Sequence, residues 1–186
     1  MDPPMKKWWM AVALVVTAGR ITHAAEAGNG PTIDLRMEND AGVPEYVLEQ
    51  SQDEVRRIFA SSGLTVRWTD TAARFTVTIV PQVLGYGRAG SPVMGVAFRQ
   101  ANRSMAQIFL KQVQNFAATY RVDLSIVLAY VIAHEVGHLL LPGNAHSAIG
   151  LMRGDWDNPL ARDLVKGTLT FTGAQAATIR ARHTSQ

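Results

Sequence analysis

Three side chains around residue 135 have the types and the spacing of a metal site. His134, Glu135 and His138 fit the pattern HExxH. Histidines four positions apart lie on one face of a helix, so both imidazoles can reach one zinc ion at about 2.0–2.1 Å. Glu135 lies about 100° further round an ideal helix, where its carboxylate can accept a proton from the attacking water. The spacing therefore predicts two metal ligands and a general base on one rigid element.

A chance match is the first alternative to a metal site. A random chain of this composition, with five histidines in 186 residues, would contain the pattern in roughly 0.4% of cases. Unpaired polar side chains inside an apolar helix would also cost about 1–3 kcal/mol each. Both arguments favour a metal site over coincidence.

A catalytic zinc ion usually has three protein ligands and one open position, so a third ligand is needed. Glu135 is the last glutamate of the chain, which excludes a glutamate from a later helix. His23 lies in the N-terminal segment and His183 near the C-terminus, whereas His146 follows the motif closely. We therefore expect His146 to be the third ligand.

The motif lies in an apolar segment, residues 124–141, that ends at Pro142 and Gly143. A helix that is hydrophobic on all sides is a buried one. Gly143 can adopt a positive φ, which would redirect the chain after such a helix. We therefore expect a buried active-site helix followed by a sharp change of direction.

The remaining pattern predicts an α+β domain over residues 28–186. Apolar residues recur at helical spacing over residues 44–61, and Gly63 follows as a stop signal. A short helix should begin near Asn158, and a capping box of Thr172 and Gln175 precedes a helix over residues 176–182. Alternating or β-branched segments predict five strands, at residues 32–38, 64–68, 75–80, 93–98 and 105–111.

The motif region resembles the metzincins, whose pattern is HExxHxxGxxH followed by a methionine turn. Gly143 and His146 keep the Gly-x-x-His spacing, although two extra residues separate them from His138, and Met152 follows. The order of strand, helix, four strands and active-site helix is also that of metzincins. The His-Ser and Leu-Met pairs near the motif are similar to the matrixin branch and to small secreted bacterial metzincin-like proteins.

The resemblance implies a metzincin-like fold, with a twisted, mixed five-stranded sheet, a long backing helix, a buried active-site helix and a C-terminal helix. It implies a zinc peptidase in which Met152 forms a hydrophobic floor, although an ordinary core methionine fits the sequence equally well. Residues 93–98 would be an edge strand that pairs with substrate, or a plain strand of the sheet. Trp156 would border the pocket for the residue after the scissile bond, or anchor its loop.

The first 27 residues have the layout of a secretory signal peptide. Lys6 and Lys7 precede an apolar run over residues 8–18, and small residues follow. A run of this length is too short for a bilayer, which needs roughly 20 apolar residues, so we expect cleavage between Ala25 and Gly28 rather than a stable membrane anchor. The absence of cysteine excludes disulfides and cysteine-ligated zinc. A net charge of +3 gives no argument for nucleic-acid binding.

These observations predict a secreted or periplasmic zinc metallopeptidase that acts on a peptide or protein substrate. Zinc would make a water molecule acidic, and Glu135 would take its proton and pass it to the leaving amine. Two alternatives stay open. One is an aspartate-type zincin with Asp155 or Asp157 as the third ligand, and the other is a secreted zinc-binding protein without catalytic activity.

Overall fold

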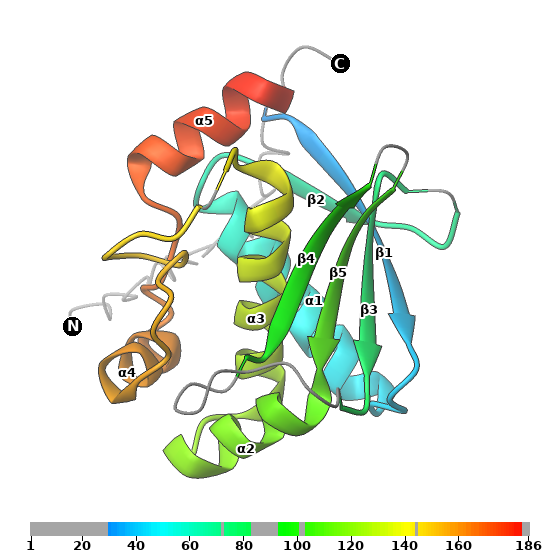
Figure 1. Ribbon diagram of the computed structural model, residues 1–186, viewed down its shortest axis with the longest axis vertical. Helices are drawn as coiled ribbons and strands as arrows, with labels where there is room; N and C mark the ends of the chain where they lie inside the picture. Colours follow the sequence, from blue (N-terminus) through cyan, green and yellow to red (C-terminus); the bar gives the residue numbers. More distant parts are fainter. Residues whose placement is uncertain (1–29, 72, 83–92, 101–102, 144, 184–186) are drawn as a thin grey trace, which may run out of the picture.

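The computed structural model describes residues 30–183 except 72, 83–92, 101–102 and 144. The predicted signal peptide, residues 1–27, lies outside the described residues. The ten elements follow one another as β1 (Thr32–Asn39), α1 (Glu45–Ala60), β2 (Thr65–Trp68), β3 (Phe75–Val80), β4 (Gly95–Gln100), β5 (Arg103–Phe109), α2 (Leu110–Tyr120), α3 (Leu124–Leu140), α4 (Asn158–Lys166) and α5 (Gly173–His183) (Figure 1). Among the described residues, no helix is both long and apolar enough to span a bilayer.

The five strands form one mixed sheet in the order β2-β1-β3-β5-β4. All neighbouring strands are parallel except β4, which runs antiparallel to β5. β4 therefore forms an edge of the sheet among the described strands, and its pairing with a substrate stays a prediction. The predicted α+β class and the mixed five-stranded sheet are confirmed.

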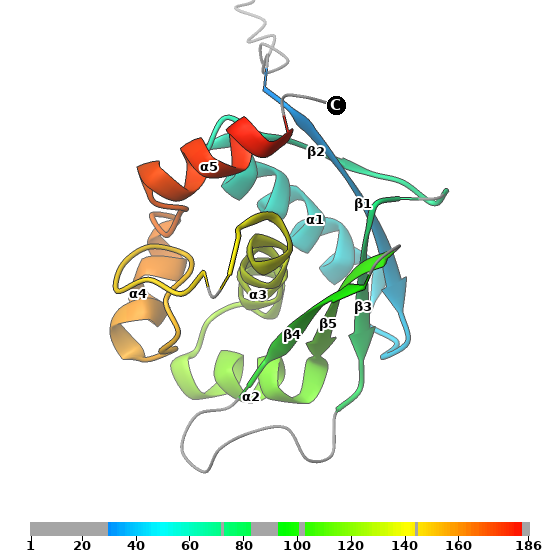
Figure 2. The ribbon, with the colours of Figure 1, turned by 45° about the horizontal axis from the view of Figure 1, so that its top comes forward.

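The helix α3 lies at the centre of the molecule. Figure 2 shows it nearly end-on, with α1 and the sheet on one side and the segments leading to α4 and α5 on the other. It contacts α1, α2, β4 and β5, and its residues from Val127 to Ala133 are almost completely buried. Its apolar sequence therefore has a physical cause, because every side of the helix faces protein. Asp123 begins it by accepting a hydrogen bond from the Ser125 amide at 2.8 Å.

The structure corrects the prediction for residues 105–111. The strand β5 ends at Phe109, and α2 begins at the next residue, whereas the sequence predicted no helix between the last strand and α3. Phe109 offers no capping side chain, and the helix ends at Arg121, which adopts the left-handed conformation without being glycine (φ 54°). Both ends of α2 thus lack the residues that usually mark a helix in sequence.

The other helix boundaries agree closely with their sequence signals. The helix α1 matches the predicted residues 44–61 to within one residue at each end, and α4 begins at Asn158 with Asp157 as its N-cap. The capping box at α5 is present. The backbone amide of Gln175 donates to Thr172 Oγ1 at 3.3 Å, and the backbone amide of Thr172 donates to Gln175 Oε1 at 3.0 Å. Two of these helices matter for the site, since α4 and α5 flank the loop that carries His146.

Candidate metal centre

The three predicted histidines converge on one point. His134 and His138 lie one turn apart on α3, and their Nε2 atoms are 3.1 Å apart. His146, from the loop after α3, places its Nε2 atom 3.2 Å from that of His138. The ligand atoms of all three lie within 4.8 Å of one another, so the group could hold a metal ion. His134 is buried, His138 is partly buried and His146 is exposed.

The ring of His134 is held from two sides. Its Nδ1 atom lies 2.9 Å from the carbonyl oxygen of Leu151. A proton on Nδ1 that donates to this carbonyl leaves the lone pair of Nε2 free, which is the tautomer that a metal ligand needs. The indole of Trp156 lies edge-on to the same ring, with centroids 5.8 Å apart, and also contacts Phe116 of α2 at 5.7 Å. Trp156 is thus an anchor for its loop and a neighbour of the site at once.

The loop that carries His146 is fastened on both sides of this residue. Gly143 turns the chain with a φ of 62°, as the sequence predicted. The Ser147 amide donates to the Met152 carbonyl at 2.8 Å. The side-chain amide of Gln175 donates to the Ala145 carbonyl at 3.3 Å and to Ser147 Oγ at 3.2 Å. The capping residue of α5 therefore also positions the third histidine, despite the two extra residues after His138.

Met152 is completely buried and packs against α3. A Cβ atom built on Gly137 would lie 2.5 Å from the sulfur of Met152 and 2.9 Å from the ring of Phe171. Gly137, which directly precedes His138, therefore leaves the space that Met152 fills. The sequence allowed Met152 to be either an ordinary core residue or the floor of the metal site. Its side chain belongs to the hydrophobic core, and it lies directly against the turn of α3 that carries the two histidines.

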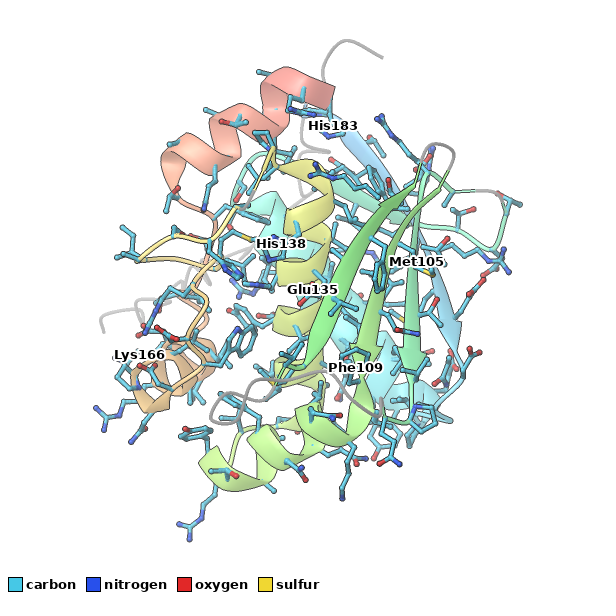
Figure 3. The ribbon with its side chains drawn as sticks, viewed as in Figure 1. Met105, Phe109, Glu135, His138, Lys166 and His183 are labelled. Carbon is cyan, nitrogen blue, oxygen red and sulfur yellow. The ribbon has the colours of Figure 1, made fainter. Side chains whose placement is uncertain are left out.

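Glu135 points towards β4. It is only 7% exposed, and in Figure 3 its side chain lies on the side of α3 nearest to β4, one turn from His138. A Cβ atom on Gly95 would lie 2.7 Å from Glu135 Cγ and 3.0 Å from Oε1, so the strand approaches the carboxylate closely only because residue 95 is glycine. Burial raises the pKa of Glu135 to about 8.

Burial also keeps two of the histidines neutral. The pKa of both His134 and His138 is lowered to about 4, mainly by burial and to a smaller extent by the neighbouring imidazoles of the cluster. For His138, the positive charge of Arg99 acts in the same direction. A metal ion binds the neutral imidazole, so the site holds these ligands in the required form at neutral pH.

The histidines and Glu135 lie in a cleft of about 650 Å³. One wall is β4 with the two residues before it, another is α3, and the loop between α3 and α4 contributes the far side with Trp156. The exposed side of His146 and this open volume leave room for a further molecule beside the three nitrogen atoms. A volume of this size is typical of sites that bind small molecules or peptide segments.

The two aspartates considered as alternative ligands do not join the cluster. Asp157 accepts a hydrogen bond from the Leu160 amide at 3.0 Å and pairs with Arg153 at 3.2 Å. Asp155 is exposed. Among the described residues, the three histidines are the one group of His, Asp and Glu side chains that could hold a metal ion.

Arg99 is a site residue that the sequence did not reveal. It lies on β4, lines the cleft, and donates hydrogen bonds from Nη2 to the carbonyl oxygens of His138 and Leu141 at the end of α3. A single arginine at the end of a strand has no motif around it, so only the folded arrangement shows this contact.

No family model matches the chain, and no curated protein is significantly similar to it in sequence. Support for a function therefore comes from the geometry of the site.

Proposed function

We propose that the chain is a secreted, zinc-dependent peptidase of the metzincin type. The observation that carries this proposal is the convergence of three imidazole Nε2 atoms beside a buried glutamate in a cleft bordered by an edge strand. A purely structural metal site would need neither the open cleft nor the carboxylate. The metzincin-like arrangement accounts for both.

The donor set fits zinc. In a tetrahedral site with Zn–N bonds of about 2.0–2.1 Å, neighbouring nitrogen atoms are about 3.3 Å apart. The nitrogen separations of 3.1 and 3.2 Å around His138 are close to this value. Three protein ligands with one position left for water or substrate are the usual set of a catalytic zinc ion. His134, His138 and His146 would therefore hold the ion.

Glu135 would act as the general base. Zinc, when bound, supplies the Lewis acidity that makes a water molecule acidic near neutral pH. A cation beside Glu135 would counter the effect of burial on its pKa and favour the carboxylate. Glu135 would then accept a proton from the water that attacks the peptide carbonyl, and donate it to the leaving amine. No covalent bond between enzyme and substrate is needed.

The arrangement of elements supports the resemblance to metzincins. The sheet carries an antiparallel edge strand beside the helix of the motif, a glycine with positive φ follows that helix, and a buried methionine packs against it. Two features differ: α2 precedes the active-site helix, and two extra residues precede Gly143. The helix α2 lies before α3 in the chain, and the two extra residues lie at the end of α3. Neither difference separates the three histidines from one another.

The proposal is tested by metal analysis and digestion of a peptide library. The chain purified without its first 27 residues should contain about one zinc ion and should cleave peptides. Cleavage should stop when a chelator removes the ion and return when zinc is added. The His134→Ala variant serves as a control for activity from contaminants. A zinc-loaded protein that cleaves no peptide of a broad library would instead support the non-catalytic zinc-binding alternative.

A further inference from the structure

The β4 side of the cleft belongs to a segment with an unusual charge distribution. Residues 71–122, which include β3, β4, β5 and α2, contain no aspartate or glutamate. The same segment contains six basic residues, Arg74, Arg88, Arg99, Arg103, Lys111 and Arg121. An excess of positive charge of this kind attracts negatively charged groups, and among the described residues Arg99 is the basic residue of this segment that lines the cleft.

Arg99 brings this charge into the cleft. Apart from the histidines, Arg99 and Glu135 are the charged side chains among the described residues that line it. Arg99 is exposed, and within the described part of the chain it forms no ion pair with a carboxylate. Its bonds to the carbonyl oxygens of His138 and Leu141 hold the guanidinium at the end of α3. The group is thus fixed in place without being paired to a carboxylate of the described residues.

The position of Arg99 along β4 sets which part of a substrate it can meet. Glu135 lies against Gly95, and Arg99 is four residues further along the strand, about 13 Å at about 3.3 Å per residue. Among the described strands β4 has a neighbour on one side only, so its other edge can pair with an extended peptide, and antiparallel pairs outnumber parallel ones. In that direction, the residue opposite Arg99 lies about four positions N-terminal to the residue opposite Gly95. Side chains directly opposite each other in such a pair are neighbours on one face, and opposite charges there attract.

We infer that the cleft selects peptides with an acidic side chain three to five residues N-terminal to the scissile bond, and that Arg99 recognises this side chain. The inference rests on the proposed peptidase function. Arg99 is a specificity residue here, remote from the bond that is cleaved. Since its guanidinium is partly open to solvent, the preference should weaken as the salt concentration rises.

The test compares glutamate with glutamine at each position of one peptide. The best-cleaved peptide of the library is made with Glu or Gln at each of five positions on both sides of the cleavage site. The wild type should prefer Glu over Gln by about tenfold in kcat/KM at a position three to five residues N-terminal to the bond. This ratio should fall to within about twofold of one in Arg99→Gln and should be partly kept in Arg99→Lys. A ratio within one variant is unaffected by any loss of overall activity.

Arg67→Gln is the matched control. It removes the same charge from β2, at the opposite edge of the sheet, and should leave the ratio unchanged. The inference is overturned if the wild type shows no Glu preference N-terminal to the bond, if the preference lies on the C-terminal side, or if it persists in Arg99→Gln.

A binding measurement separates this inference from the proposed function. Zinc-loaded Glu135→Gln, mixed with the labelled Glu and Gln peptides, should bind the Glu peptide more tightly by fluorescence anisotropy. If the zinc-loaded wild type cleaved no peptide while Glu135→Gln and the wild type both bound the Glu peptide more tightly, the peptidase proposal would be overturned and the role of Arg99 kept. Cleavage by the wild type without any preference for Glu would keep the peptidase proposal and overturn the role of Arg99.

Discussion

At the level of single residues, His146 distinguishes two kinds of metal site. It completes the cluster from a loop, whereas Asp157 caps α4 and pairs with Arg153. His146→Ala should weaken zinc binding by more than about 100-fold, the upper range for losing a residue that only supports a ligand. Asp157→Ala should keep the zinc and lose about 1 kcal/mol of stability with the helix cap.

A competition titration with a coloured chelator measures the zinc affinities of His146→Ala and Asp157→Ala. The Asp155→Ala variant is the control for the general effect of removing a negative charge. If His146→Ala bound zinc as tightly as the wild type while an aspartate variant did not, the ligand set of two His and one Asp would replace the one proposed here.

His134 and His138 should destabilise the metal-free chain in acid. The pKa of His134 and of His138 is about 4 in the folded chain, below the ordinary value of 6.5. Between these values the unfolded chain binds more protons at these two residues than the folded one, so their contribution to stability falls as the pH is lowered from about 6.5 towards 4, whereas the raised pKa of Glu135 acts in the opposite direction. Protons compete with zinc for these nitrogen atoms of the folded chain only as the pH approaches about 4, so their neutral form favours zinc binding at about pH 6 to 7.

Thermal unfolding of the zinc-free chain at several pH values checks this dependence. The melting temperature of His134→Asn should change less between pH 7 and pH 4.5 than that of the wild type. An identical pH profile for the two proteins would mean that His134 is not held neutral by burial.

At the level of elements, the contact between β4 and α3 fixes the carboxylate of Glu135. Gly95→Ala would place a Cβ atom 2.7 Å from Glu135 Cγ and displace the side chain. Because a displacement of about 1 Å at a reacting group can cost about 100-fold in rate, hydrolysis should fall by about this factor while zinc content stays unchanged.

Gly173→Ala is the matched control, because a Cβ atom there has no neighbour within 4 Å. The steady-state rates of both variants at equal zinc content decide the question. A Gly95→Ala variant as active as the wild type would show that β4 can move away without consequence.

Local signals explain which elements could be predicted from the sequence. The caps of α4 and α5 lie next to the helices they begin, so Asp157, Thr172 and Gln175 revealed them. The helix α2 has apolar residues at helical spacing, Leu110, Val113 and Phe116, but no capping residue at either end, and it directly continues a strand. Tertiary packing therefore decides where β5 ends.

The candidate site was predictable to the extent that it is local. The spacing of His134, Glu135 and His138 on one helix defines their relative positions before any tertiary contact forms. The placement of His146 depends on Gln175 and Met152, which lie beyond it in the chain, so the sequence could only favour it. Arg99 reaches the end of α3 from another element, and such a contact between distant segments leaves no pattern in the sequence.

At the level of the whole molecule, the described fold begins close to the predicted cleavage site. A Cβ atom on Gly30 would overlap the backbone of Gly63, so the chain is already packed two residues before β1. Cleavage between Ala25 and Gly28 would leave every described element intact. Expression in a host with an export pathway should therefore give a folded mature chain, and N-terminal sequencing measures where it starts. An exported protein that keeps residues 1–20 would show anchoring instead of cleavage.

The measurement that tests the central claim most directly is the rate of peptide hydrolysis by Glu135→Gln. The amide keeps the shape of the side chain but cannot accept the proton of the attacking water. With zinc content and melting temperature matched to the wild type, the rate should fall by about 10² to 10⁴-fold, the usual contribution of a general base. A Glu135→Gln protein that hydrolyses the peptide as fast as the wild type would contradict the proposed mechanism.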